Sequence, residues 1–392
     1  MSGDAIPWSV APSGLAGAPM SPVITRIEKE LREIWATPAG PGEAPKTRVC
    51  TMNLIVIAGS RAMADKYTSI VDEVTASIPA RAILVALEPD APGATLDGEA
   101  SAICAVGGEA GGAACSERVR LTATGSTCAR VASAVEALCV PEIPTTLVWL
   151  GRVHVDDPVF LALADRAQRV VLDTEYTSLA SLMKLAAWTR ADSGRPAVAD
   201  LAWTRLAVWQ ELCARFFDDP KMQDHAHGIT KLTLSQASDK GARLGSEGAL
   251  LLGWLATRLG WKLQRLGGAM RFRRPDGGHV AVTLTAVARP AEVAPAALAG
   301  IVIEAEAGGV KATGSIQRDL GSGMEGQSPD ADMVLWTLDV PLPTATHQRV
   351  RLRDNKGGKL LVRTLHRPVN DPTLSEAVAF AEEVFEDGLV CN

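Results

Sequence analysis

The sequence predicts an α/β protein, with a mostly parallel sheet flanked by helices followed by an α+β C-terminal domain with an antiparallel sheet. Up to about residue 195, short apolar runs alternate with helical stretches, which is the rhythm of strand–helix–strand units. Beyond Pro196 the strand-like segments alternate apolar and polar residues, which is typical of a sheet with one covered face. The chain therefore divides into two folded parts.

The first 45 residues are expected to form a flexible tail with one short helix. Residues 1–20 are rich in Pro, Gly, Ala and Ser. Ser21-Pro22 then begins a helix that extends to Trp35, with proline at the first helical position. A second loose stretch, Thr37 to Pro45, separates this helix from the rest.

Residues 46–195 are predicted to form the α/β domain. Val49 to Ala58 is an almost unbroken apolar run, as a strand covered on both faces requires. Met63 to Ile78 is expected to be a helix, and Ser126 or Thr127 could cap another that extends to Leu138. The further expected strands are Ala82 to Leu87, Glu117 to Thr124, Thr145 to Leu150 and Arg169 to Asp173.

Residues 196–392 are predicted to form the α+β domain. Its helices are expected at Ala202 to Phe217, at Ser246 to Gly260 and from Asp371-Pro372 to Phe385. The expected strands are Lys231 to Ser235, Met270 to Arg274, His279 to Thr285, Ala299 to Glu306, Gly309 to Gln317 and Met333 to Leu338.

Composition limits the class of protein. The chain of 392 residues is too long for one ordinary core, and its 47% hydrophobic and 21% charged residues suit a globular protein. A formal charge of -6 argues against general nucleic-acid binding. The most apolar helix, Ala249 to Trp261, is short and contains Arg258, and Asp4 stands where a secretory signal would be basic. We therefore expect a cytoplasmic protein without a membrane partner.

Seven cysteines are scattered without a C-x-x-C pair. Such a set predicts reduced thiols, most of them small core residues. The alternative is redox control through Cys104 and Cys115, which flank a glycine-rich loop.

The motifs of common enzymes are absent from the sequence. Gly107 to Gly112 follows a short strand, but it lacks the G-x-G-x-x-G spacing and precedes a new strand, not a helix, so it offers no amide cradle for a pyrophosphate. His154 and the pair His225 and His227 do not supply a metal-ligand set. The sequence therefore predicts no catalytic residues, no cofactor and no metal.

Polar residues at strand ends are candidates for a ligand site. In open α/β sheets, ligands bind beyond the carboxyl ends of the strands. Ser60, Arg61 and Arg152 fall at such ends and could hold a phosphorylated sugar. The alternative is a purely structural role.

Two sets of residues are candidates for binding a partner protein. Arg349, Arg351 and Arg353 alternate with apolar residues, so on a strand their guanidinium groups share one face. That face could bind a carboxylate-rich surface or a phosphate, or it could be a solvated edge strand that blocks aggregation. Trp203 and Arg205 lie away from the apolar stripe of their helix and are types common in binding hot spots. We expect both at an exposed helix edge.

The helix segment from Asp200 to Leu212, DLAWTRLAVWQEL, resembles the signature of the OpcA family. Four further strings resemble the family in the same order: TRVCTMNL at 47–54, CSERV at 115–119, PTTLVW at 144–149 and GWLATRLGW at 253–261. Family members often carry two adjacent cysteines before the Glu-Arg pair, whereas Ala114 precedes Cys115 here, so thiol-based regulation does not transfer.

The resemblance implies a function through a partner. It implies a non-catalytic protein that acts on glucose-6-phosphate dehydrogenase in the oxidative pentose phosphate pathway. Such a protein promotes the active oligomer of that enzyme or raises its activity. One alternative is a sugar-phosphate-binding sensor or enzyme that uses the α/β domain. A second alternative is a structural scaffold for other partners.

Overall fold

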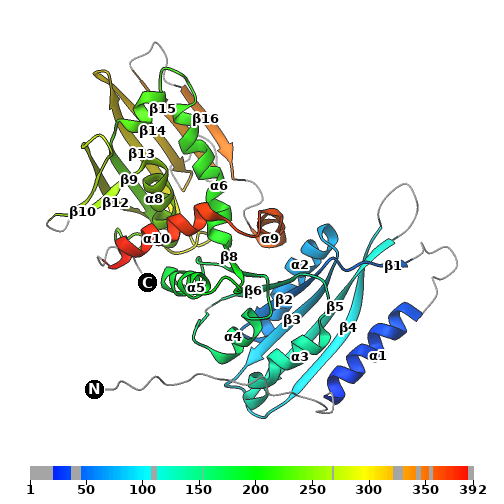
Figure 1. The fold of residues 1–392 in the computed structure, drawn as a ribbon. Coiled ribbons are helices and arrows are strands. Elements are labelled where there is room, and N and C mark those ends of the chain that lie inside the picture. Colours follow the sequence, from blue (N-terminus) through cyan, green and yellow to red (C-terminus); the bar gives the residue numbers. More distant parts are fainter. Residues whose placement is uncertain are drawn as a thin grey trace, which may run out of the picture.

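A computed structural model describes residues 21–36, 46–106, 113–151, 153–266, 269–320, 330–340, 346–352 and 356–386. Two sheets of eight strands each form the centres of two domains (Figure 1). The first is almost entirely parallel and the second mixed, so the predicted fold class is confirmed.

Sheet A follows the order β1-β5-β3-β2-β6-β7-β8, with β4 paired to β5. Every pair is parallel except β4 with β5. Strands β2, β3 and β6 are buried over almost their whole length, which explains their continuous apolar runs. The strands are β1 (Lys46–Arg48), β2 (Met52–Ala58), β3 (Ala80–Glu88), β4 (Leu96–Val106), β5 (Ala113–Thr124), β6 (Thr145–Leu150), β7 (Arg169–Leu172) and β8 (Ala197–Asp200).

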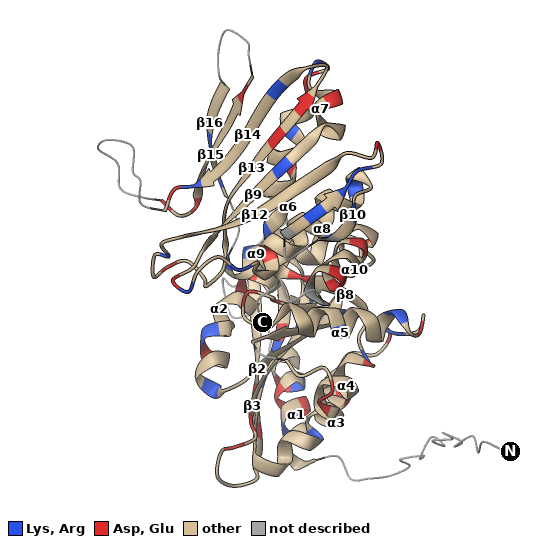
Figure 2. Ribbon diagram, turned by 90° about the vertical axis from the view of Figure 1, so that its left-hand side faces the viewer, with Lys and Arg blue, Asp and Glu red and all other residues tan. Residues whose placement is uncertain are grey.

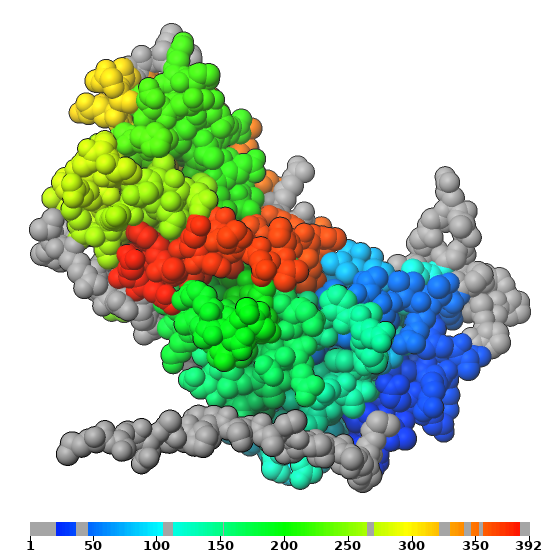
Figure 3. All heavy atoms as spheres, in the orientation of Figure 1, coloured from blue at the N-terminus to red at the C-terminus, as the bar shows by residue number. Residues whose placement is uncertain are grey.

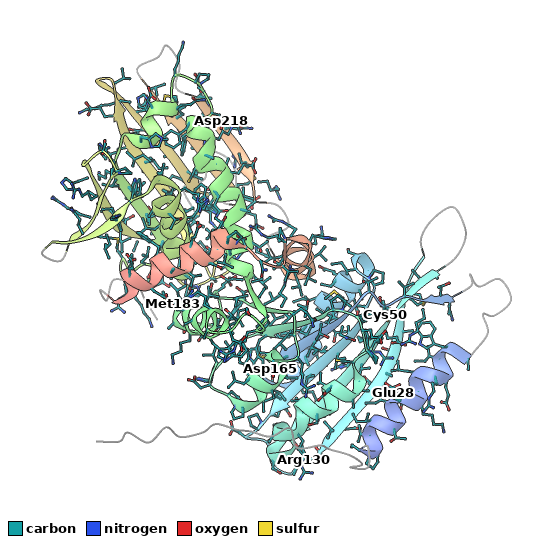
Figure 4. All side chains as sticks on the ribbon, in the orientation of Figure 1. Glu28, Cys50, Arg130, Asp165, Met183 and Asp218 are labelled. Atoms are coloured by element: carbon teal, nitrogen blue, oxygen red, sulfur yellow. A yellow bond between two sulfur atoms is a disulfide. The ribbon has the colours of Figure 1, made fainter. Side chains whose placement is uncertain are left out.

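Helices cover both faces of sheet A. Helix α2 (Arg61–Ser77) packs over one face, whereas α1 (Pro22–Ala36) and α3 (Val131–Leu138) lie over the other (Figure 1). Figure 4 shows Glu28 on α1, whose carboxylate lies 3.1 Å from the guanidinium of Arg81 on β3. The predicted helix in the N-terminal segment is thus packed on the domain. Helices α4 (Pro158–Ala164) and α5 (Leu179–Arg190) complete this layer.

Sheet B follows the order β10-β11-β12-β9-β13-β14-β15-β16. Its pairs are antiparallel except the parallel pair β12 and β9. The strands are β9 (Ile229–Ala237), β10 (Lys262–Leu266), β11 (Ala269–Arg273), β12 (His279–Val287), β13 (Leu298–Ala307), β14 (Val310–Arg318), β15 (Met333–Asp339) and β16 (Thr346–Arg351). Helices α6 (Leu201–Ala214), α8 (Ser246–Leu259) and α10 (Pro372–Glu386) lie on one face of this sheet (Figure 1).

The chain crosses the junction between the domains in more than one place. Strand β8 still belongs to sheet A, although it follows residue 196, and it leads directly into α6. Helix α9 (Gly357–His366) packs against α2 of the first domain and buries Leu360 and Leu361 there. Figure 3 shows α9 and α10, in orange and red, as a band across the junction. Domain boundaries at 45 and 195 therefore stay a prediction.

Candidate functional site

The first strand-to-helix turn of sheet A, between β2 and α2, is filled by side chains of the chain itself. The Ser60 hydroxyl caps α2 by accepting a hydrogen bond from the backbone N–H of Met63 at 3.2 Å. The backbone N–H of Arg61 donates to Glu88 Oε1 at 2.8 Å. Glu88 ends β3, the neighbouring strand. A phosphate at the start of a helix binds to free backbone amides. Here two of those amides already donate to Glu88 and Ser60.

Of the three predicted ligand residues, the structure therefore places only Ser60 and Arg61 together. Ser60 and Arg61 do lie at the carboxyl end of β2, but the Ser60 oxygen serves as a helix cap. Arg61 is exposed. Arg152 lies outside the described residues.

A buried charged cluster joins the two domains, and Arg205 of α6 is at its centre. Its guanidinium lies 2.6 Å from Asp173, 2.9 Å from Glu175 and 3.1 Å from Glu247. Asp173 and Glu175 follow β7 of sheet A, whereas Glu247 is in the first turn of α8. The Arg205 side chain is only 11% exposed. This cluster attaches α6 to both domains.

Asp200 extends the same cluster at the start of α6. Its carboxylate accepts hydrogen bonds from the backbone N–H of Thr174 at 3.0 Å and from the Thr174 hydroxyl at 2.8 Å. It also caps α6 through the N–H of Ala202. The first acidic residue of the family-like string is thus a structural link between β8, α6 and the segment after β7.

Several carboxylates share one guanidinium, and this affects their protonation. Burial raises the pKa of Glu175 to about 7, with Arg205 opposing the rise and Asp173 and Glu247 adding to it. Burial, assisted by Asp173, raises the pKa of Asp200 to about 6. The carboxylates in turn raise the pKa of Arg205 against the effect of burial. The cluster therefore holds its arginine charged, while Glu175 titrates near neutral pH.

Trp203 is a core residue, and the prediction of an exposed helix edge is wrong. Trp203 is 2% exposed, and its indole Nε1 donates to Asp371 Oδ2 at 2.9 Å. Asp371 also accepts from Arg367 and from the N–H of Leu374, where α10 begins. The Arg205 side chain, 11% exposed, is not at an exposed edge either. Helix α6 lacks a free face there because it contacts both α8 and α9.

The arginine stripe does lie on a strand at an edge of sheet B. Arg349 and Arg351 belong to β16, and their side chains are 36% and 57% exposed. Arg349 pairs with Asp319 at 3.4 Å, and Arg351 pairs with Asp330 at 2.9 Å. Arg353 lies outside the described residues. Two accessible guanidinium groups on one strand face thus agree with the expected geometry. In Figure 2, cationic and anionic residues are interspersed over both domains.

Cys104 and Cys115 form a disulfide between the adjacent strands β4 and β5, where they face each other in register. The expectation of reduced thiols is wrong for this pair, because the strand register brings the two sulfur atoms together. Cys50, Cys128, Cys139 and Cys213 are free, and Cys128 and Cys213 are buried. Cys391 is outside the described residues.

A cleft of about 940 Å³ lies between the domains, and no motif in the sequence predicts it. One wall comes from the segment after β7 and the amino end of α5, the other from the loops that follow β9 and β12. Two of its four lining Lys and Arg residues, Lys240 and Arg243, come from the segment SDKGARLG at 238–245, whose sequence is typical of an ordinary loop. No cluster of metal-ligating side chains occurs in the described part of the chain. No helix in that part is long and apolar enough to cross a membrane.

Comparisons with known proteins identify the family. Residues 48–187 match the family described as glucose-6-phosphate dehydrogenase subunit N-terminal domain. Residues 196–378 match the corresponding C-terminal domain. A putative OxPP cycle protein OpcA from Nostoc punctiforme is 30% identical over 144 residues, 37% of this chain and 30% of that protein. One of the same name from Synechocystis is 28% identical over 146 residues, 37% and 29% of the two chains. These alignments span about a third of the curated relatives.

Solved structures show only remote likeness. An NAD binding oxidoreductase from Klebsiella pneumoniae gives a TM-score of 0.46 at 10% identity, over 87% of this chain and 99% of that chain. Levoglucosan dehydrogenase in complex with NADH gives 0.40 at 12% identity, over 87% and 90%. Likeness at this level carries no information on activity. The two family matches, by contrast, cover most of the sequence in the expected order, and the chain belongs to the OpcA family of glucose-6-phosphate dehydrogenase subunits.

Proposed function

We propose that this chain is a cytoplasmic, non-catalytic partner of glucose-6-phosphate dehydrogenase. It promotes the active oligomer of that enzyme or raises its activity, and so acts in the oxidative pentose phosphate pathway. Family membership supports the partner, since both matched domains are described as parts of a dehydrogenase subunit.

The observation that carries the non-catalytic part is the hydrogen bond from the Arg61 N–H to the Glu88 carboxylate. In dinucleotide-binding domains the first strand-to-helix turn receives the pyrophosphate on free backbone amides. Here Glu88 and Ser60 accept from two of those amides, and Glu88 brings a negative charge to the same place. A pyrophosphate would have to displace a carboxylate and then remain beside it.

A partner of this kind acts through differential affinity. It raises activity only if it binds the active form of the dehydrogenase more tightly than the inactive form, because equal affinity shifts no population. Arg349 and Arg351 are the candidates for electrostatic docking, since both guanidinium groups are accessible on the β16 edge. Charges at the rim of an interface mainly accelerate encounter.

The test is sedimentation velocity with dehydrogenase from the same organism, fluorescently labelled so that only its species are detected. We expect the added chain to move the labelled enzyme to a larger species at micromolar concentrations. The chain alone should neither bind nor reduce a nicotinamide cofactor in the presence of glucose 6-phosphate. Unchanged sedimentation, or turnover that is lost on substitution of a residue in this chain, would overturn the proposal.

A further inference from the structure

The interdomain cleft lies where an α/β sheet places its ligands. The segment Thr174–Ser178 follows β7 and forms one wall, so the cleft faces the carboxyl end of that strand. Figure 1 shows α5 and β8 where the two domains meet, and Figure 4 labels Met183 on α5 at this junction. At about 940 Å³ the cleft is within the size range of small-molecule sites.

The cleft has more cations than its own anions neutralise. Of the carboxylates that line it, Glu175 and Glu247 pair with Arg205, and Asp239 pairs with Arg289 at 3.2 Å. The lining residues Lys240 and Arg243 have no ion pair or side-chain hydrogen bond to any described residue. Two uncompensated positive charges in one concave surface are notable in a chain of net charge -6. They favour an anionic ligand.

Backbone donors face the same space. The amino ends of α5, with 12 residues, and α8, with 14, both line the cleft. The start of α8 at Gly245 has no side-chain cap, so its first amides remain available for an acceptor. Behind Gly245, Gln236 is 1% exposed, and neither atom of its side-chain amide has a hydrogen-bond partner in the described structure. The uncapped amino end of α8 thus lies over a buried side-chain amide that the protein leaves unsatisfied.

The rest of the lining suits a polyhydroxylated molecule. Ser178 and Ser181 also line the cleft, but Ser178 caps α5 by accepting from the N–H of Ser181, and the Ser181 hydroxyl donates to the Val153 carbonyl at 3.2 Å. Their oxygens can therefore offer a sugar only their remaining lone pairs. Tyr176, which is 65% exposed, also lines the cleft and combines an aromatic ring with a phenolic hydroxyl. Together with the free cations, this surface matches a ligand that has a sugar at one end and a phosphate at the other.

From this geometry we infer that the cleft binds a phosphorylated sugar, with Lys240, Arg243 and the α8 amino end holding the phosphate. The chain would then be a sensor of that metabolite as well as a partner protein. The site differs from the strand-end set of Ser60, Arg61 and Arg152, and it does not depend on the partner role.

The test is isothermal titration calorimetry of the full chain at low salt, with glucose 6-phosphate as the probe. We expect saturable binding that weakens with added salt. The variant Lys240→Gln/Arg243→Gln should bind at least about tenfold and up to about a hundredfold more weakly, since two charge-assisted hydrogen bonds are lost and each is worth about one decade in affinity. The matched control Lys66→Gln/Lys221→Gln removes two exposed charges elsewhere and should stay within about twofold.

Two further arms separate the parts of the ligand. Glucose should show no saturable binding, and inorganic phosphate should bind more weakly than glucose 6-phosphate. The charge-conserving variant Lys240→Arg/Arg243→Lys should retain binding, which shows that the charge and not the fold was lost in the Gln variant. The inference would be overturned if no binding were seen up to about 10 mM, which corresponds to a binding free energy weaker than about 3 kcal/mol. It would also be overturned if the cleft variant and the control variant bound with equal affinity. The third contradicting result is glucose that binds as tightly as glucose 6-phosphate. The dehydrogenase is absent from this experiment, so its outcome is independent of the partner test.

Discussion

Replacing Trp203 with alanine tests whether the family-like string at 200–212 encodes the joint between domains. Trp203 is 2% exposed, so truncation removes a fully packed indole at a cost of about 3 to 5 kcal/mol. It also removes the donor to Asp371, although that carboxylate keeps the bonds from Arg367 and from Leu374. Hydrogen bonds to charged groups contribute about 1.5 to 3 kcal/mol, so the conservative Trp203→Phe should cost about that much.

The assay is urea unfolding followed by far-ultraviolet circular dichroism, with the free energy of unfolding compared among variants. Because whole domains are stable by about 5 to 15 kcal/mol, Trp203→Ala should shift the transition far toward low urea. The matched control is Trp188→Ala on α5, where the indole is only half-buried and stacks under Arg195. We expect the control to cost clearly less. Mutations at average sites lower the free energy of unfolding by about 1 kcal/mol. If Trp203→Ala lowered it by less than that, Trp203 would not be a core residue.

Three further perturbations have defined outcomes. Burial raises the pKa of Glu175 from 4.5 to about 7, so the folded state loses stability as pH rises through that window. Glu175→Gln should therefore leave unfolding unchanged near pH 4.5 and add up to about 3 kcal/mol at pH 8, and a gain confined to acid pH would contradict this. Arg349→Gln/Arg351→Gln should slow association with the dehydrogenase at low salt in stopped flow, while the free energy of unfolding changes by no more than about 0.5 kcal/mol. An unchanged association rate would mean that these arginines only protect the edge strand from aggregation. Cys104→Ser/Cys115→Ser should lower the free energy of unfolding by about 2 to 4 kcal/mol, and an unaltered urea midpoint would rule out a stabilising disulfide.

The sheets could be predicted because their strands are covered. The run from Val49 to Ala58 contains β2, which is buried along its entire length. Because both faces of this strand are covered, nearly all of its side chains are apolar, and the run is visible in the sequence. The alternating strands of the second domain were found for the complementary reason, since β13 and β14 bury alternate residues over much of their length.

The roles of Trp203 and Arg205 could not be predicted from helical spacing. A helical wheel assumes one buried face, whereas α6 lies between α8 and α9 and is buried on several sides. The partners that satisfy these side chains are far away in sequence: Asp371 is 168 residues from Trp203, and Asp173 is 32 residues from Arg205. Only the folded chain brings those carboxylates to α6.

The full length of strand β4, of which only a short strand before Gly107 was expected, and helix α9 were missed for related reasons. Strand β4 includes Asp97, Gly98 and Glu99, which are types depleted in strands, and its long antiparallel pairing with β5 overrides that local preference. That same register aligns Cys104 with Cys115, which spacing alone does not show. Helix α9 begins at a Gly-Gly pair and is stabilised by packing on α2.

The proposed partnership is tested most directly by the initial rate of the dehydrogenase from the same organism, measured while this chain is titrated at fixed enzyme concentration. We expect a saturable change in rate that reaches a plateau at a fixed molar ratio, with no turnover from the chain alone. A rate that stays constant at every ratio up to micromolar excess, with the enzyme's oligomer distribution also unchanged, would contradict the proposed role as a partner.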